Sequence, residues 1–153
     1  MREVAPEERA AARARRGLGG RPTVVVYSRL FEFDTARLAA VLAGVRDAVP
    51  DVAVLLVGAG LYDADSARFR EQLAAAGLLA AVVDVGWGAP AGPPAALGGA
   101  DGCLHTMADT PLNRAHGPVK LGAGVAAATS AGRPARAVMA SARLMASVGR
   151  ASR

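Results

Sequence analysis

The segment that decides the fold is Thr23-Val-Val-Val-Tyr-Ser-Arg-Leu-Phe-Glu-Phe-Asp34, an apolar run that ends abruptly in a polar turn. A short apolar run with β-branched residues is typical of a strand covered on both faces in a parallel sheet. Ligands of open α/β sheets bind beyond the carboxyl ends of such strands. Arg29 follows the run directly, so the sequence places a cation where an anionic ligand would bind. The alternative is that Arg29 only pairs with Glu32 or Asp34 at the surface.

Helix and strand patterns alternate outward from this segment. Strands that alternate with helices predict right-handed βαβ units and a parallel sheet. We therefore expect an α/β fold, a Rossmann-like three-layer domain with a parallel sheet of at least four strands. The expected helices are residues 6–16, a helix that Asp34 caps and that runs to Val49, and residues 63–76 with Gly77 as C-cap; the expected strands are 23–28, 52–57, 81–85 and a weaker one at 101–105.

The organisation along the chain follows from these patterns. We expect a helical lead-in over residues 1–20, a Rossmann-like ligand-binding domain over 21–122, and an Ala/Arg-rich C-terminal segment over 123–153 that has no clean strand. The chain has 153 residues, which suits a single domain with a real core. One cysteine excludes an intramolecular disulfide, and no apolar run reaches the ~18 residues that span a bilayer. We expect a cytoplasmic protein without a transmembrane segment.

The formal net charge of +5 raises the possibility of nucleic-acid binding. The charge is unevenly distributed, because Asp109 is the last acidic residue and seven basic residues follow it, the first being Arg114 and the last Arg153. That basic part of the chain lacks the aromatic residues on which bases stack. We therefore expect no nucleic-acid partner.

Two further groups follow predicted strands at the same edge as Arg29. Gly58-Ala-Gly60 comes after the second strand, and its backbone amides are expected to face this edge, where a phosphate could use them. The pattern lacks the third glycine of a dinucleotide loop, so a simple tight turn is the alternative. Trp87 follows the third strand and either stacks on a nucleobase or fills a gap in a core of small residues.

The loop after the fourth strand, residues 109–120, is unusually polar for this alanine-rich chain. It contains Arg114, His116 and Lys120, and three cation-capable groups at one sheet edge suit a diphosphate. A solvated loop is the alternative. Cys103 and His105 occupy alternate strand positions, and we interpret them as core residues because no second base activates the thiol. Neither a catalytic triad nor a metal-ligand spacing nor a P-loop is present, so no metal or cofactor is expected.

In this order the motifs resemble the C-terminal, nucleotide-sugar-binding half of GT-B glycosyltransferases of the family 4 (group 1) type. The similarity runs from Pro22 to about Lys120. It is carried by Val26-Tyr-Ser-Arg-Leu30, Val54-Leu-Leu-Val-Gly-Ala-Gly60, Val83-Asp-Val-Gly-Trp87, Ala100-Asp-Gly-Cys-Leu104, Pro111-Leu-Asn-Arg-Ala115 and Pro118-Val-Lys-Leu121.

The resemblance implies sugar transfer from a nucleoside-diphosphate donor, usually with retention and without an obligatory metal. It implies that Arg29 binds the diphosphate of the donor. Together with the sequence patterns, it gives an expected set of donor-binding residues: Arg29, Gly58, Gly60, Trp87, Arg114 and Lys120. The catalytic residues are unknown. Asp34 and Ala123 stand where the family commonly has a lysine and a ribose-binding glutamate. The N-terminal acceptor domain of the family is expected to be missing, so the chain alone is expected to be inactive. A non-catalytic Rossmann-like structural or interaction module is the alternative function.

Overall fold

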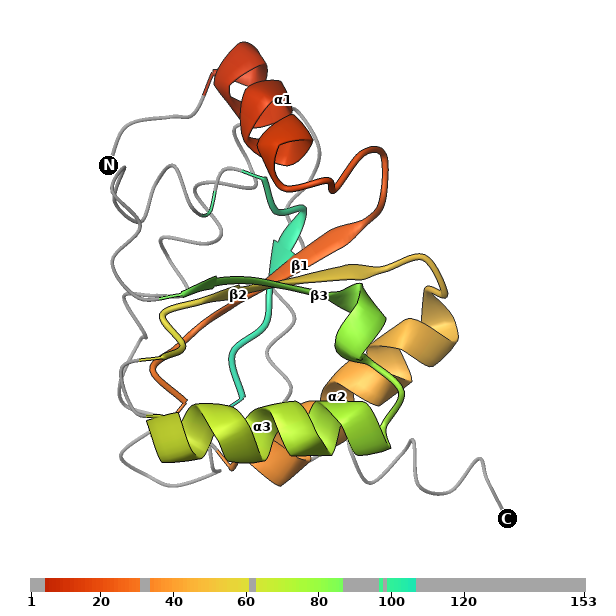
Figure 1. The fold of residues 1–153 in the computed structure, drawn as a ribbon. Coiled ribbons are helices and arrows are strands. Elements are labelled where there is room, and N and C mark those ends of the chain that lie inside the picture. The colour runs from red at the N-terminus through yellow and green to blue at the C-terminus, as the bar shows by residue number, and fades with distance from the viewer. Residues whose placement is uncertain (1–4, 31–33, 61–62, 87–96, 98, 107–153) are drawn as a thin grey trace, which may run out of the picture.

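The computed structural model describes residues 5–30, 34–60, 63–86, 97 and 99–106. These residues form one sheet whose strands lie in the order β3-β2-β1-β4, and every neighbouring pair is parallel (Figure 1). The predicted α/β fold with a parallel sheet of four strands is therefore confirmed. The helices are α1 (Pro6–Arg15), α2 (Thr35–Ala48) and α3 (Asp63–Ala75), η1 (Leu79–Ala81) is a short 3-10 helix, and the strands are β1 (Thr23–Tyr27), β2 (Ala53–Val57), β3 (Val82–Gly86) and β4 (Gly102–Cys103).

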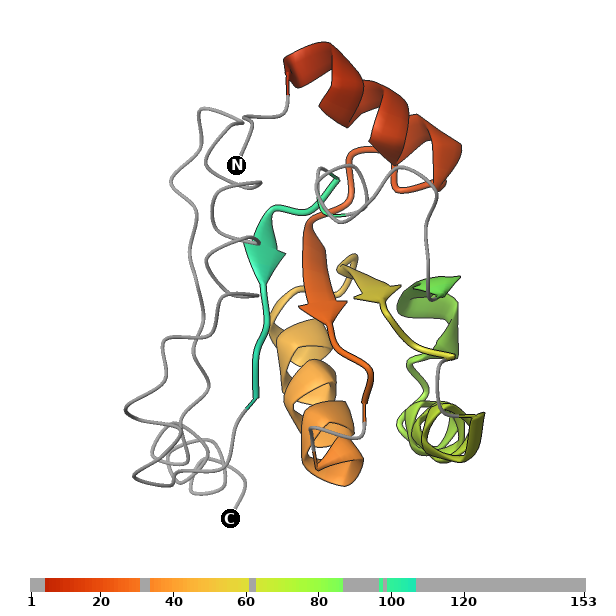
Figure 2. The same ribbon diagram turned by 90° about the vertical axis from the view of Figure 1, so that its left-hand side faces the viewer.

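Helices lie on both sides of the sheet. Figure 1 shows α2 and α3 below it and α1 above it, and the perpendicular view in Figure 2 agrees. The larger apolar core lies between the sheet and the pair α2 and α3, where Val26 and Leu56 pack with Leu38, Leu42 and Phe69. Alternate strand residues, among them Val25 and Leu55, form a second cluster on the other face. The central strands are thus buried on both faces, as their apolar sequences predict.

Local signals in the sequence fix where the helices begin and end. Asp34 caps α2 as predicted, because its Oδ1 accepts a hydrogen bond from the Arg37 amide at 3.1 Å. Gly77 ends α3 with a φ of +66°, and the next amide, that of Leu78, donates to the Leu73 carbonyl at 2.8 Å. This is a Schellman motif, which glycine forms without steric cost. Both predicted caps are confirmed.

The strand boundaries differ from the prediction. Strand β1 ends at Tyr27 and not at Ser28, β2 begins at Ala53 and not at Val52, and β3 ends at Gly86 and not at Val85. The third strand begins at Val82 and not at Ala81, because Ala81 closes η1 and its amide donates to the Leu78 carbonyl at 2.9 Å. The fourth strand was expected over residues 101–105 but contains only Gly102 and Cys103. It pairs only with β1 among the described strands, which fits its weak sequence pattern.

An ionic cluster fastens α1 to the amino-terminal end of the sheet. The Asp101 carboxylate, just before β4, accepts from Arg9 Nη2 at 2.8 Å, from Arg13 Nη1 at 3.3 Å and from the amide of Thr23 at 2.8 Å. Arg13 also donates to the carbonyl of Gly99 at 2.6 Å. One carboxylate therefore joins α1, the start of β1 and the start of β4.

Candidate functional site

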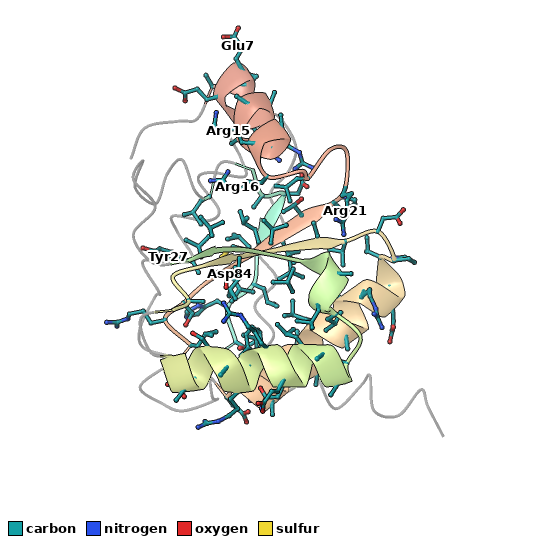
Figure 3. The ribbon with its side chains drawn as sticks, viewed as in Figure 1. Glu7, Arg15, Arg16, Arg21, Tyr27 and Asp84 are labelled. Carbon is teal, nitrogen blue, oxygen red and sulfur yellow. The ribbon has the colours of Figure 1, made fainter. Side chains whose placement is uncertain are left out.

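Three turns meet at the carboxyl edge of the sheet. They are Ser28–Leu30 after β1, Gly58–Gly60 after β2, and Gly86 at the end of β3. The Ser28 amide donates to the Val57 carbonyl at 3.0 Å, and the Gly58 amide donates to the Gly86 carbonyl at 2.9 Å. The parallel strands thus bring together residues that are distant in the sequence. Figure 3 labels Tyr27 and Asp84 toward this end of the sheet and Arg21 toward the opposite end.

The turn after β1 holds Arg29 between two buried residues. Leu30 has a φ of +69°, a left-handed conformation that is uncommon for a leucine, and its side chain is fully buried in the core between the sheet and α2. The Ser28 hydroxyl, also buried, accepts from the Leu30 amide at 2.9 Å. Strained backbone persists where packing and hydrogen bonds fix it, and it concentrates at functional sites. The half-buried Arg29 is therefore presented by a fixed turn.

The turn after β2 requires glycine at its first position. Gly58 has a φ of +94°, and a Cβ there would lie 3.0 Å from the carbonyl oxygen of Ser28. Gly60 has a similar φ of +93°, but a Cβ there would meet no atom within 4 Å. The absent side chain of Gly58 thus lets the turns after β1 and β2 approach each other closely.

The two glycine amides already have partners within the protein. The Gly58 amide binds the Gly86 carbonyl, and the Gly60 amide donates to the Ser66 hydroxyl in α3 at 2.9 Å. In this structure, the two glycines determine the shape of the turn, and their amides are already bonded to protein acceptors. Arg29, Gly58 and Gly60 are the predicted site residues that lie at this edge; Trp87, Arg114 and Lys120 lie outside the described residues.

Three polar residues of this edge were not predicted from the sequence. They are Ser28, Ser66 and Asp84, and each one accepts a hydrogen bond from a backbone amide of a turn. Asp84 also carried a recognisable signal, because it is a charged residue within an apolar strand pattern. The serines carried no such signal, because short polar residues are common at the ends of strands and helices.

Cys103 and His105 are both buried, at 4% and 6% exposure. Burial raises the pKa of the Cys103 thiol to about 11, so the thiol stays protonated and weakly nucleophilic at neutral pH. This agrees with the interpretation of Cys103 as a core residue. Across the described ranges, no three His, Cys, Asp or Glu side chains gather in a way that could hold a metal ion.

No helix within the described part of the chain has the length and apolar character needed to cross a membrane.

No protein-family model matches this sequence, and no curated protein matches it. Solved structures do match in fold. Three structures of HepE from Anabaena match this chain: one contains UDP and glucose, one contains UDP, and one contains UDP-glucose. Each aligns with a TM-score of 0.63 and with 23 to 24% sequence identity. The alignment covers 92% of this chain and 36% of HepE, so this chain spans about a third of the length of that protein.

Proposed function

We propose that this chain binds the nucleoside diphosphate of a nucleotide-sugar donor at the carboxyl edge of its sheet. The observation that carries the proposal is the fixed turn that places Arg29 at the end of β1, in contact with the glycine turn after β2. A guanidinium offers a rigid set of donors that matches phosphate oxygens. Ligands of parallel α/β sheets gather at this edge because the loops after the strands converge there.

The likeness in fold to HepE supports the same ligand class. HepE was solved with UDP and with UDP-glucose, and its matching region covers nearly all of this chain. We infer that this chain corresponds to the donor-binding half of a GT-B glycosyltransferase of the family 4 type. In this proposal Trp87, Arg114 and Lys120 complete the donor site. A second domain supplies the acceptor-binding site and the catalytic groups.

The alternative is a Rossmann-like module that binds no nucleotide. One observation favours it: the amides of Gly58 and Gly60 are occupied by protein acceptors. A diphosphate at this edge must then depend on side-chain cations or displace these bonds. The two functions therefore differ in what they predict for Arg29.

The decisive experiment is a titration with UDP and GDP, followed by amide NMR and calorimetry, on the parent chain and on Arg29→Ala. We expect chemical-shift changes that cluster at Gly58, Gly60 and Gly86. The loss of the arginine should weaken binding by about 1.5–3 kcal/mol, the range for a hydrogen bond to a charged group.

Arg68→Ala is the matched control, because Arg68 lies on the exposed surface of α3 and pairs only loosely, at 3.5 Å, with Asp65. Its affinity for either nucleotide should equal that of the parent. Unchanged spectra at millimolar nucleotide would favour the non-binding module. Equal affinity in Arg29→Ala and the parent would move the phosphate site to other residues.

A further inference from the structure

A chain of hydrogen bonds runs from the surface of α3 into the candidate site. Asp84 accepts with both carboxylate oxygens, Oδ2 from Arg70 Nη2 at 2.7 Å and Oδ1 from the amide of Gly86 at 2.8 Å. The Gly86 carbonyl in turn accepts from the Gly58 amide at 2.9 Å. Two hydrogen bonds therefore connect Asp84 to the glycine turn after β2. Figure 3 labels Asp84 toward the same end of the sheet as Tyr27.

The strand pairing explains why a side chain is needed at this place. Leu56 of β2 pairs with Asp84 of β3, but Val57 pairs with Gly86, so the register skips Val85. A bulge of this kind interrupts the ladder and leaves backbone groups that need other partners. The Asp84 carboxylate accepts from the amide of Gly86, which has a φ of +72°. It thereby fixes where the Gly86 carbonyl meets Gly58.

The position of Gly58 has a direct consequence for β1. A Cβ on Gly58 would lie 3.0 Å from the Ser28 carbonyl oxygen, so the backbones of the turns after β2 and β1 lie close together here. Ser28 precedes Arg29 in the chain. Through the hydrogen bond to Gly58 and this close approach, we expect a shift of Gly86 to displace the turn that carries the arginine.

We propose that Asp84 is a positioning residue for the nucleotide-binding edge, which it orders through Gly86 and Gly58 without touching the ligand itself. The inference rests on the proposed nucleotide binding. Both bonds of Asp84 are exposed, and Arg70 contributes less to this role because an exposed ion pair is weak and holds no backbone group of the edge, whereas the Oδ1 bond ends on the amide of Gly86. The Oδ1 bond to Gly86 is the part that carries the function.

Three variants separate the two bonds of Asp84. Asp84→Ala removes both, Asp84→Asn keeps an oxygen that can accept from the Gly86 amide, and Arg70→Ala removes only the ion pair. We expect Asp84→Ala to weaken UDP binding at least about tenfold, since small misplacements of positioning groups are costly. Asp84→Asn and Arg70→Ala should stay within about threefold of the parent, as suits loss of an exposed pair.

Hydrogen exchange gives a second readout that does not depend on a ligand. The amides of Gly58 and Gly86 should exchange faster in Asp84→Ala than in the parent, and Asp84→Asn should restore their protection. Asp101→Asn is the control for general destabilisation, because Asp101 lies at the opposite end of the sheet. It should lower the melting temperature and leave UDP affinity unchanged.

The outcomes distinguish the two proposals. If the parent binds UDP and Asp84→Ala binds it equally well, the positioning role is wrong although the proposed function stands. If the parent binds no nucleotide, the proposed function fails, and the exchange rates still decide whether Asp84 orders the edge. Unchanged protection of Gly58 and Gly86 in Asp84→Ala would overturn the inference in either case.

Discussion

Alanine at Gly58 tests whether the close approach of the turns after β1 and β2 builds the candidate site. Gly58 has a φ of +94°, and an added Cβ would lie 3.0 Å from the backbone oxygen of Ser28. Gly60 is a natural control, because its φ is +93° and an added Cβ would meet nothing within 4 Å. The two substitutions therefore share the backbone cost and differ in the steric contact.

The magnitude follows from these two terms. A left-handed conformation costs a residue other than glycine about 1–2 kcal/mol, and both variants should lose this much stability. Gly58→Ala must also move the Ser28 carbonyl, and overpacking of this kind typically costs about 1–3 kcal/mol more. We expect Gly58→Ala to lower the free energy of unfolding by about 2–5 kcal/mol in total.

Urea unfolding measures the stability term, and calorimetry with UDP measures the effect on the site. Because Ser28 precedes Arg29, Gly58→Ala should also weaken UDP binding more than Gly60→Ala does. Equal stability losses in the two variants, within about 0.5 kcal/mol, would refute the steric argument, since that is the scatter of additive effects. Equal UDP affinities would show that the contact does not reach the ligand.

Three other predictions concern the ionic cluster, the buried thiol and activity. Asp101→Ala leaves Arg9 and Arg13 without their carboxylate, so it should lower the free energy of unfolding, measured with denaturant, by about 2–4 kcal/mol. The control is Asp65→Ala, which breaks an exposed ion pair and should lower it by at most about 0.5 kcal/mol. The folded pKa of Cys103 is raised from 9.0 to about 11, so its contribution to stability is present below pH 9 and is lost as the pH rises toward 11. The urea midpoint should therefore fall more between pH 8 and 10.5 in the parent than in Cys103→Ala, and equal falls would contradict this. In a donor-consumption assay, the chain alone should transfer no sugar at a useful rate. The reason is that positioning by a second domain can supply ~7–11 kcal/mol of the barrier reduction. Acceptor-dependent release of nucleoside diphosphate would contradict this prediction.

The alternation of apolar strands with capped helices was sufficient to predict the architecture. The caps at Asp34 and Gly77 and the parallel pairing of β1 with β2 are all local patterns or direct consequences of them. The start of β3 was missed by one residue because Leu79–Ala81 form a 3-10 turn, which the apolar pattern of this segment does not distinguish from a strand. Sequence patterns describe elements well when the deciding interactions lie within them.

The details of the candidate site were less predictable because they depend on contacts between elements and on the pairing of β3 with β2. Arg29 and the glycine turn were identified as features that follow strands. The bond from Gly60 joins its turn to Ser66 in α3, and the bond from Gly86 to Asp84 forms where β3 bulges against β2. Nothing in the local sequence states that the glycine amides are occupied. In the proposed site, the occupied amides make a side-chain cation the more important group for a phosphate.

The two ends of β1 are held by different interactions. At the amino end, the Thr23 amide donates to the Asp101 carboxylate, which α1 also holds through its arginines. At the carboxyl end, the backbone of Ser28 lies so close to Gly58 that an added Cβ would be 3.0 Å from its carbonyl oxygen. Five residue steps separate Thr23 from Ser28, roughly 16 Å at the rise of a strand, and effects at sites more than about 7–10 Å apart usually add. Changes in the ionic cluster should therefore alter how often the domain unfolds without changing the shape of the glycine turn.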